Sequence, residues 1–318
     1  MLKLQRTNIL KKQKKHGRDT RTIREIMHER VELRIGNLPK DYHCSCVFCK
    51  KFLGELIRPD GTHYSRNDRR HYYTTAESAS TKDATVGHIA KTPLHIARWA
   101  VQTFTKGGDW VLDPTAGAGT TLVEALTHGR NAVGVEIQTI DVMKNNIKYV
   151  LANPETDRPN AHHACVHGDA RELKKLLDNV APPKPFALIV NNPPYSGDAS
   201  QVGFKGASYT YDETRANLAF LKEGPEYFMI LGEIYTECCR RLRKGGRLVI
   251  GVKDQTHNKA PDMLHHKIAE VIMKIPDMKY EGTAVLRHYP TTLHLNTYFK
   301  KTGVHPPYFQ TICVFQKK

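Results

Sequence analysis

The segment Asn191-Asn192-Pro193-Pro194-Tyr195 follows a short apolar run and combines oxygen acceptors with an aromatic ring. Because proline restricts the backbone, the Pro193 carbonyl and the Asn192 amide oxygen are expected to face one point. Two acceptors there hold the two protons of a planar amino group and free its nitrogen lone pair to attack an electrophilic carbon. Tyr195 offers a ring on which a base stacks. The segment therefore predicts a clamp for a base amine, whose alkylation depends on placement more than on a strong base.

The alternative interpretation of this segment is an ordinary proline-rich turn after a strand. A similar sequence, His305-Pro306-Pro307-Tyr308, precedes an expected strand instead of following one. We interpret that second copy as a turn, because it lacks a position at a strand's carboxyl end.

Three carboxylates stand where predicted strands end: Asp113, Glu136 and Asp169. A turn containing Gly117 and Gly119 follows the first of them and opens a predicted helix. Glycines let a backbone approach a ligand closely, and the free amides at the start of a helix then face that ligand. The spacing is not that of the dinucleotide fingerprint, because no third glycine falls in phase. Glu136 is suited to ribose hydroxyls and Asp169 to an adenine amino group, so the sequence predicts an adenosine-type cofactor.

In combination, Asp113-Pro114-x-x-Gly117-x-Gly119-Thr120-Thr121 and Asn192-Pro193-Pro194-Tyr195 resemble the S-adenosylmethionine-dependent amino-methyltransferases that act on cytosine or adenine bases. The segment 88–93 is similar to the part of that family that closes over the methionine end of the cofactor. The segment 129–136 also matches the family. The resemblance covers residues 86–318.

The resemblance implies roles for the matching positions. The catalytic residues, which would hold the target amine, are Asn192, Pro193, Pro194 and Tyr195. The positions expected to bind S-adenosylmethionine are Thr92, Pro93, Asp113, Pro114, Ala116, Gly117, Gly119, Thr120, Thr121, Glu136, Ile137, Asp169 and Ala170.

Regular alternation of strands and helices from residue 92 onward must position these groups. Strands are predicted at 110–112, 132–135, 163–166, 186–190, 247–252, 283–286 and 311–315, and helices at 94–104, 122–126, 140–151, 173–180, 227–242 and 264–275. Such alternation predicts an α/β fold: a doubly wound, mostly parallel, Rossmann-like methyltransferase sheet with helices on both faces. Ligands bind such sheets at the carboxyl ends of the strands, where both motifs fall. Gly245-Gly246 is predicted to stop the helix before the fifth strand.

The chain of 318 residues has a net charge of +16, 40% hydrophobic residues and 25% charged residues, which excludes wholesale disorder. Residues 1–40 carry twelve Lys and Arg against four acidic residues. We predict a small basic N-terminal module over 1–85 that grips phosphates, followed by the methyltransferase domain over 86–318. A solubilising tail is the alternative for the basic run at 11–18.

The order of the motifs bears on the substrate. The cofactor motif precedes the Asn-Pro-Pro-Tyr motif, whereas many small DNA-modifying members of the family have the reverse order, and no long insertion is present to read sequence. The order is similar to that of RNA-amine methyltransferases with an N-terminal RNA-binding module. We therefore predict methylation of a base amine in structured RNA such as rRNA or tRNA, with cytosine 4-amino favoured over adenine 6-amino.

Three alternatives remain open. The first is the same chemistry on DNA. The second is methylation of a protein glutamine side chain, because those enzymes also use Asn-Pro-Pro-Tyr; Thr120-Thr121 and the basic arm argue against it. The third is a catalytically silent nucleic-acid-binding module, which the full set of site residues disfavours.

Three cysteines, Cys44, Cys46 and Cys49, crowd into six positions and offer half of a standard zinc site. Three reduced cysteines in a packed turn are the alternative. Seven cysteines in all suit a reducing compartment better than a disulfide framework. The chain shows no apolar run long enough for a membrane span and no secretory signal, so a cytoplasmic location without a membrane partner is predicted. The oligomeric state is left open.

Overall fold

The computed structural model describes residues 52–55, 92–152, 161–194, 218, 221, 224–254, 256–257, 260–261, 263–287 and 309–318. The chain divides into two units, 1–47 and 48–318, and the described residues all lie in the second. The cysteine cluster and Tyr195 are outside the described residues, so the roles expected for them stay predictions.

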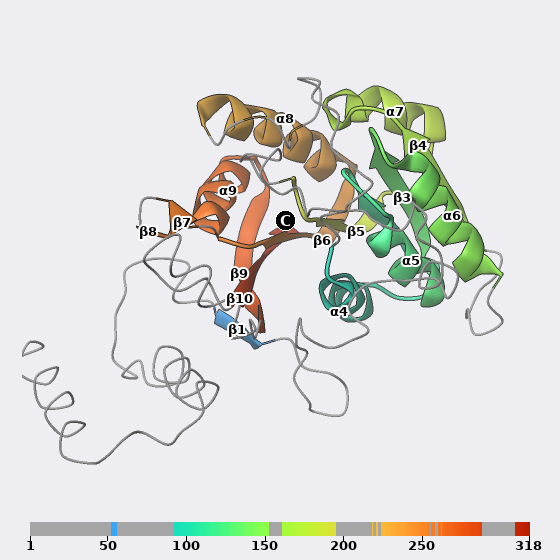
Figure 1. The fold of residues 1–318 in the computed structure, drawn as a ribbon, viewed down its shortest axis with the longest axis horizontal. Helices are drawn as coiled ribbons and strands as arrows, with labels where there is room; N and C mark the ends of the chain where they lie inside the picture. Colours follow the sequence, from blue (N-terminus) through green and yellow to red (C-terminus); the bar gives the residue numbers. More distant parts are fainter. Residues whose placement is uncertain are drawn as a thin grey trace, which may run out of the picture. The chain divides into compact units, whose positions relative to one another are not determined.

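Helices and strands alternate along the described part of the chain, as predicted from the sequence (Figure 1). The strands are β1 (Phe52–Glu55), β2 (Trp110–Asp113), β3 (Asn131–Glu136), β4 (His163–His167), β5 (Phe186–Asn191), β6 (Leu242–Val252), β7 (Thr256–His257), β8 (Ala260–Pro261), β9 (Met278–Arg287) and β10 (Phe309–Lys317). The helices are α4 (Leu94–Phe104), α5 (Thr120–Thr127), α6 (Ile140–Leu151), the 3-10 turn η3 (Ala170–Glu172), α7 (Leu173–Val180), α8 (Pro225–Arg241) and α9 (Leu264–Met273).

Within the described residues, one eight-stranded sheet has the order β1-β9-β10-β6-β5-β2-β3-β4. The run β6-β5-β2-β3-β4 is parallel throughout, whereas β10 is antiparallel to both β6 and β9. Strand order reverses between β2 and β5, which places the switch point of the doubly wound sheet beside those two strands. The predicted fold class, a mostly parallel α/β sheet, is confirmed.

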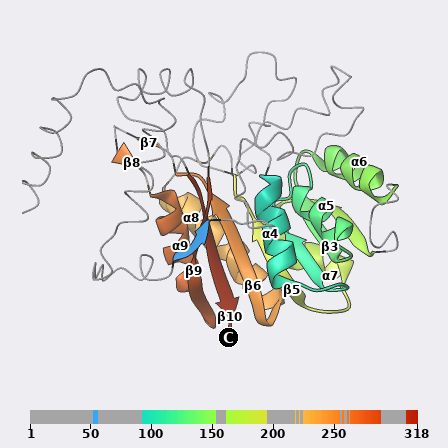
Figure 2. The same ribbon diagram turned by 90° about the horizontal axis from the view of Figure 1, so that it is seen from below.

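Each face of the sheet is covered by its own layer of helices (Figures 1 and 2). On one face, α4, α5 and α6 bury a core that includes Ile96, Leu122 and Met143. On the other, α7, α8 and α9 bury a second core that includes Leu177 and Tyr235. The central strands β2 and β5 are buried along their whole length, as expected of parallel strands with helices on both sides.

Two local features differ from the sequence-based expectations. The helix α8 ends at Arg241, because Leu242 is already extended with ψ 135°. The predicted stop at Gly245-Gly246 is therefore wrong, and these glycines instead lie in β6, where Gly245 has a positive φ of 73° beside an irregularity in the pairing with β5. The edge strand β1, parallel to β9, comes from a segment in which no strand was predicted.

No helix in the described part of the chain is long and apolar enough to cross a membrane.

Candidate active site

The carboxyl ends of four neighbouring strands bring the two predicted motifs to one edge of the sheet. Strand β2 ends at Asp113, β3 at Glu136 and β5 at Asn191, and Asp169 follows β4 by two residues. The order β5-β2-β3-β4 places these ends in sequence along that edge. The cofactor motif and the Asn-Pro-Pro motif are thus adjacent in the fold although far apart in the chain.

Asp113 lies at the switch point and is 1% exposed. Its Oδ2 accepts a hydrogen bond from Thr121 Oγ1 at 2.6 Å, and its Oδ1 accepts from the Thr115 amide at 3.2 Å. The same Oδ1 accepts from Asn191 Nδ2 at 3.3 Å. Asp113 therefore fastens the glycine turn, the start of α5 and the end of β5 to one another.

Burial raises the pKa of Asp113 to about 6, because the charged carboxylate is removed from water. The hydrogen bonds from Thr121, Thr115 and Asn191 oppose this shift in pKa, and the charge of Glu136 adds to it. The acid is thus held in its place by donors that favour the ionised form.

The turn between β2 and α5 requires glycine at two positions. Gly117 and Gly119 have φ values of 54° and 83°, in the left-handed region. At Gly119 a β-carbon would also lie 2.8 Å from Met143 Cγ on α6. Packing against α6, and not only the approach of a ligand, therefore explains this glycine.

Glu136 receives three backbone amides on its carboxylate. Gly117 N donates to Oε2 at 2.8 Å, while Gln138 N and Thr139 N both donate to Oε1 at 2.9 Å. A carboxylate oxygen has room for two hydrogen bonds, so Oε2 keeps one acceptor position among the described contacts. That position fits one ribose hydroxyl; a second hydroxyl would have to displace the Gly117 amide.

Asp169 is half-buried and bound to Arg171. Its Oδ1 accepts from the Arg171 amide at 2.9 Å, and its Oδ2 accepts from Arg171 Nε at 2.8 Å and from Arg171 Nη2. One acceptor position therefore remains on Oδ1 in the described contacts, which fits the amino group of an adenine. The acceptor positions that remain on Glu136 and Asp169 are compatible with an adenosine-type cofactor.

The remaining cofactor positions surround these acids. Pro114, Ala116 and Thr120 are buried within or just after the glycine turn. Ile137 and Ala170 follow Glu136 and Asp169, and the Ile137 carbonyl accepts from His167 Nε2 at 3.0 Å. Thr92 and Pro93 directly precede α4, and the Pro93 carbonyl accepts from Ile96 N at 3.0 Å.

Asn191 connects the cofactor turn to the predicted clamp, a role that the sequence did not reveal. Its Nδ2 donates to Thr115 Oγ1 at 2.7 Å as well as to Asp113, and its Oδ1 accepts from Tyr235 on α8 at 2.9 Å. Burial raises the pKa of Tyr235 well above its usual value, so its hydroxyl remains a donor. In the sequence, Asn191 stood out only because it directly precedes Asn192. Its hydrogen-bond partners could not be predicted, because they lie far away in the chain.

The clamp residues Asn192, Pro193 and Pro194 follow at once. Tyr227 on α8 donates its hydroxyl to the Pro194 carbonyl at 2.8 Å and so fixes the backbone after β5. Asn192 Oδ1 is buried and makes no hydrogen bond to any described residue. A buried acceptor without a partner costs free energy, about 1–3 kcal/mol, and is suited to receive an N–H from a ligand.

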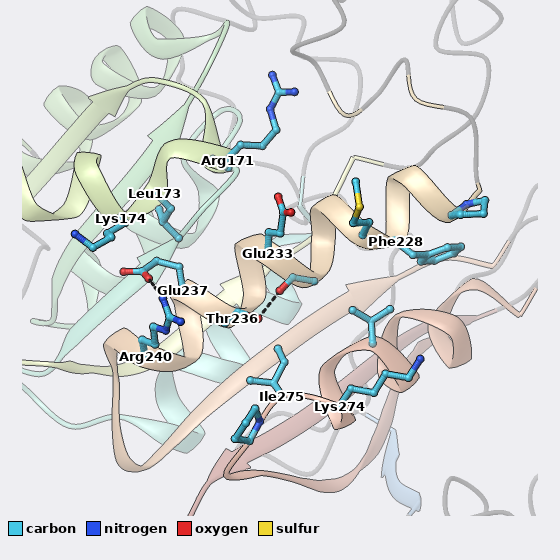
Figure 3. A pocket seen from close by; sticks show the side chains of 16 residues that line it. Arg171, Leu173, Lys174, Phe228, Glu233, Thr236, Glu237, Arg240, Lys274 and Ile275 are labelled. Carbon is cyan, nitrogen blue, oxygen red and sulfur yellow. Dashed lines mark hydrogen bonds and ion pairs between the residues drawn. The ribbon is translucent and has the colours of Figure 1, made fainter.

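A groove of about 720 Å³ lies between α8, which contributes Glu233 and Thr236, and the end of α9, where Lys274 and Ile275 follow (Figure 3). Its charged side chains are largely compensated, since Arg240 donates to Glu237 at 3.4 Å and Arg171 is bound to Asp169. We assign no chemistry to this groove. Among the described residues, no cluster of three or more His, Cys, Asp or Glu side chains could hold a metal ion.

Comparison with known proteins finds a family that is similar to part of the chain. Residues 6–142 match a family model described as DNA methylase. The matched range contains the glycine turn and Glu136 and ends before Asn192. The predicted resemblance to the amino-methyltransferases is confirmed for this part of the chain.

Two curated proteins are similar to parts of the chain. The Type II methyltransferase M.BglI of Bacillus subtilis is 31% identical over 93 residues, which are 28% of this chain and 27% of that protein. The Type II methyltransferase M.MthZI of Methanothermobacter thermautotrophicus is 42% identical over 45 residues, or 14% of this chain and 13% of that protein. The chain thus spans about a quarter or less of the length of these relatives. Among solved structures, TrmN from Thermus thermophilus aligns over 72% of this chain and 50% of its own, with 12% identity and a TM-score of 0.44.

Proposed function

We propose that this relative of the DNA methylases is an S-adenosylmethionine-dependent methyltransferase acting on an exocyclic amino group of a nucleic-acid base. The observation that carries the proposal is the buried, unpartnered acceptor Asn192 Oδ1 at the carboxyl end of β5. It lies next in the chain to Asn191, which is bonded to the turn that precedes α5. An acceptor for an amine thus adjoins a turn and two acids that fit an adenosine.

Different residues of the chain would bind the cofactor and the substrate amine. Glu136 Oε2 and Asp169 Oδ1 would hold a ribose hydroxyl and the adenine amino group through their remaining acceptor positions. When bound, S-adenosylmethionine supplies an electrophilic methyl group on a sulfonium sulfur. Asn192 Oδ1 and the Pro193 carbonyl would accept hydrogen bonds from the two N–H groups of the substrate amine and direct its lone pair. Tyr195 would stack on the flipped base. Catalysis then depends on positioning the amine and on preorganised acceptors that stabilise the charge developing in the transition state.

We favour RNA as the substrate. The motif order and the basic residues 1–40, with twelve Lys and Arg against four acidic residues, support a module that grips a folded RNA by its phosphates. DNA is the second candidate, and the family description and the Type II methyltransferase relatives favour it. The preference for cytosine 4-amino over adenine 6-amino rests on the resemblance alone.

The substrate is identified by incubating the full chain with methyl-labelled S-adenosylmethionine and total RNA, genomic DNA or protein extract. The nucleic acid or protein is then digested and the methylated species identified. Label on a cytosine or adenine amine in RNA supports the proposal, and label on the same group in DNA alone moves it to the second candidate. Label on protein glutamine alone refutes the nucleic-acid assignment.

The clamp is tested by Asn192→Ala. We expect kcat to fall by about 10²–10³, as when one preorganised hydrogen bond to the reacting group is removed. The dissociation constant of the cofactor, measured calorimetrically, should not change. Asn131→Ala is a matched control, since Asn131 lies at the opposite end of the sheet, where its Nδ2 donates to the Gly108 carbonyl. Undiminished transfer by Asn192→Ala would refute the assignment.

The remaining proposals concern the organisation of the chain into domains and the cysteine cluster. We propose that 1–85 is the nucleic-acid-binding module and 86–318 the methyltransferase domain, in a cytoplasmic protein. Deleting 1–40 should weaken RNA binding and flatten its salt dependence while cofactor affinity is kept. Zinc held by Cys44, Cys46 and Cys49 is checked by metal analysis of the purified protein, and a stoichiometry near zero ends that idea.

A further inference from the structure

Gly251 on β6 lies directly beside Asn192 of the clamp. Strands β5 and β6 are parallel, and Asn191 is paired with Ile250 in their register. Asn192 directly follows the end of β5, and Gly251 directly follows Ile250 on β6, so the two residues lie side by side at the carboxyl edge. Gly251 is buried and is not among the glycines with positive φ. Backbone conformation therefore gives no reason for a glycine at this position.

The reason for a glycine at residue 251 is the lack of room for a β-carbon. A β-carbon on residue 251 would overlap Asn192 Oδ1 and would lie 3.0 Å from Asn192 Cγ. It would also lie 3.3 Å from Ile96 Cδ1, in the first turn of α4. The absent side chain of Gly251 thus leaves the space that the Asn192 amide occupies.

The neighbouring asparagine is held in a different way. Asn191 is fixed by hydrogen bonds to Thr115, Asp113 and Tyr235. The Asn192 amide oxygen has no such bond among the described residues, so its position depends on the shape of the space around it. A change in that shape moves the acceptor itself.

We propose that Gly251 is a positioning residue for the transfer reaction: because it lacks a side chain, the Asn192 amide oxygen lies where it accepts a hydrogen bond from the substrate amine. This inference rests on the proposed function. It assigns a role to a residue outside both sequence motifs and explains how an acceptor without a hydrogen bond of its own is oriented.

The kinetic test is Gly251→Ala. We expect kcat to fall by about a hundredfold, the scale that a misplacement of roughly 1 Å costs, with the cofactor dissociation constant unchanged. Gly246→Ala is the matched control on the same strand, because its β-carbon would lie 2.9 Å from the Arg243 carbonyl and 3.0 Å from the Ala187 carbonyl, away from Asn192. Gly246→Ala should lower the melting temperature and leave kcat per folded enzyme near wild type.

A second measurement needs no catalysis and so separates this inference from the proposed function. Gly251→Ala alone should lower the melting temperature, because the new methyl group collides with the Asn192 amide. In the Asn192→Ala background the same change should cost little, since the colliding atoms are gone. Equal shifts in both backgrounds would overturn the inference, as would a kcat of Gly251→Ala equal to or above wild type in an active enzyme. A wild-type chain without methyl transfer, but with this coupling, would refute the function and leave the contact standing.

Discussion

The two halves of the site differ in how their acceptors are held. On the cofactor side, Asp113, Glu136 and Asp169 each accept three hydrogen bonds from the protein itself. On the clamp side, Asn192 Oδ1 accepts none from the described residues and is placed by the space beside Gly251. The acceptors on the cofactor side are thus held by hydrogen bonds, whereas the acceptor on the clamp side is held by the packing around it.

This difference indicates what each half can tolerate. A carboxylate with most of its lone pairs already engaged is fixed before a ligand arrives, and little reorganisation is left to do. An amide oxygen without a partner keeps both of its acceptor positions for the substrate. Until a substrate binds, this buried oxygen lowers the stability of the protein. Asn191 lies on the border between the halves, so it is the first place to test the comparison.

The largest effect is expected from Asn191→Leu. The change removes the acceptor of the buried Tyr235 hydroxyl and one donor to Asp113, and it should lower the free energy of unfolding by about 2–4 kcal/mol. Urea denaturation followed by circular dichroism measures it. In the Tyr235→Phe background the loss should shrink, because a buried donor is no longer left unpaired. A loss below about 1 kcal/mol would show that the cofactor half does not depend on this bond.

The next effect is a pH dependence that comes from Asp113. Its pKa is about 6 in the folded protein against a usual 3.8, so between these values the native state binds more protons than the unfolded chain. Stability from this group is therefore present at low pH and is lost as pH rises from about 4 to about 6. At about 1.4 kcal/mol per pKa unit, the loss is at most about 3 kcal/mol.

Asp113→Asn checks this expectation. Unfolding free energies of the wild type and the variant are measured from pH 4 to pH 8, and the contributions of other groups cancel in the difference. The stability of the variant should improve relative to wild type as pH rises through the window. Parallel curves would mean that the donors to Asp113 fully offset its burial.

The smallest effect is expected from Gly119→Ala. A left-handed φ costs an L-residue about 1–2 kcal/mol, and the clash with Met143 adds to it. Gly245→Ala separates these causes, since Gly245 has φ 73° but its β-carbon would meet nothing within 4 Å. Chemical denaturation should show a larger loss at 119 than at 245, and calorimetry should show weaker cofactor binding only at 119. Equal losses of unfolding free energy at the two positions would contradict the view that packing against Met143 requires glycine at 119.

Much of the fold could be predicted from the sequence because it depends on local patterns. The apolar faces of α4, α6 and α8 repeat at helical spacing, and the buried strands are short apolar runs followed by polar residues. Two features escaped this reasoning. The end of α8 was misplaced because Gly245-Gly246 was taken as a helix stop, whereas Leu242 had already joined β6. The strand β1 was missed because its four residues, FLGE, carry little pattern of their own.

The site was predictable only where its residues adjoin in sequence. The strand-end acids and Asn192 follow from the motifs, whereas the roles of Tyr235 and Gly251 arise from contacts between distant segments. Tyr235 reads as one more apolar position of α8, and Gly251 as an unexceptional residue in a buried strand. Only the parallel register of β5 and β6 places Gly251 beside Asn192.

The pairing of β1 with β9 has a consequence for how the chain can be shortened. A strand at the edge of a sheet exposes a row of amides and carbonyls that can recruit another chain. Phe52–Glu55 covers part of that row on β9. A fragment that starts at residue 86 would lose this cover and is expected to self-associate, whereas one that starts at residue 41 keeps it. Light scattering of the two fragments would show whether the segment that contains β1 also protects the protein from aggregation.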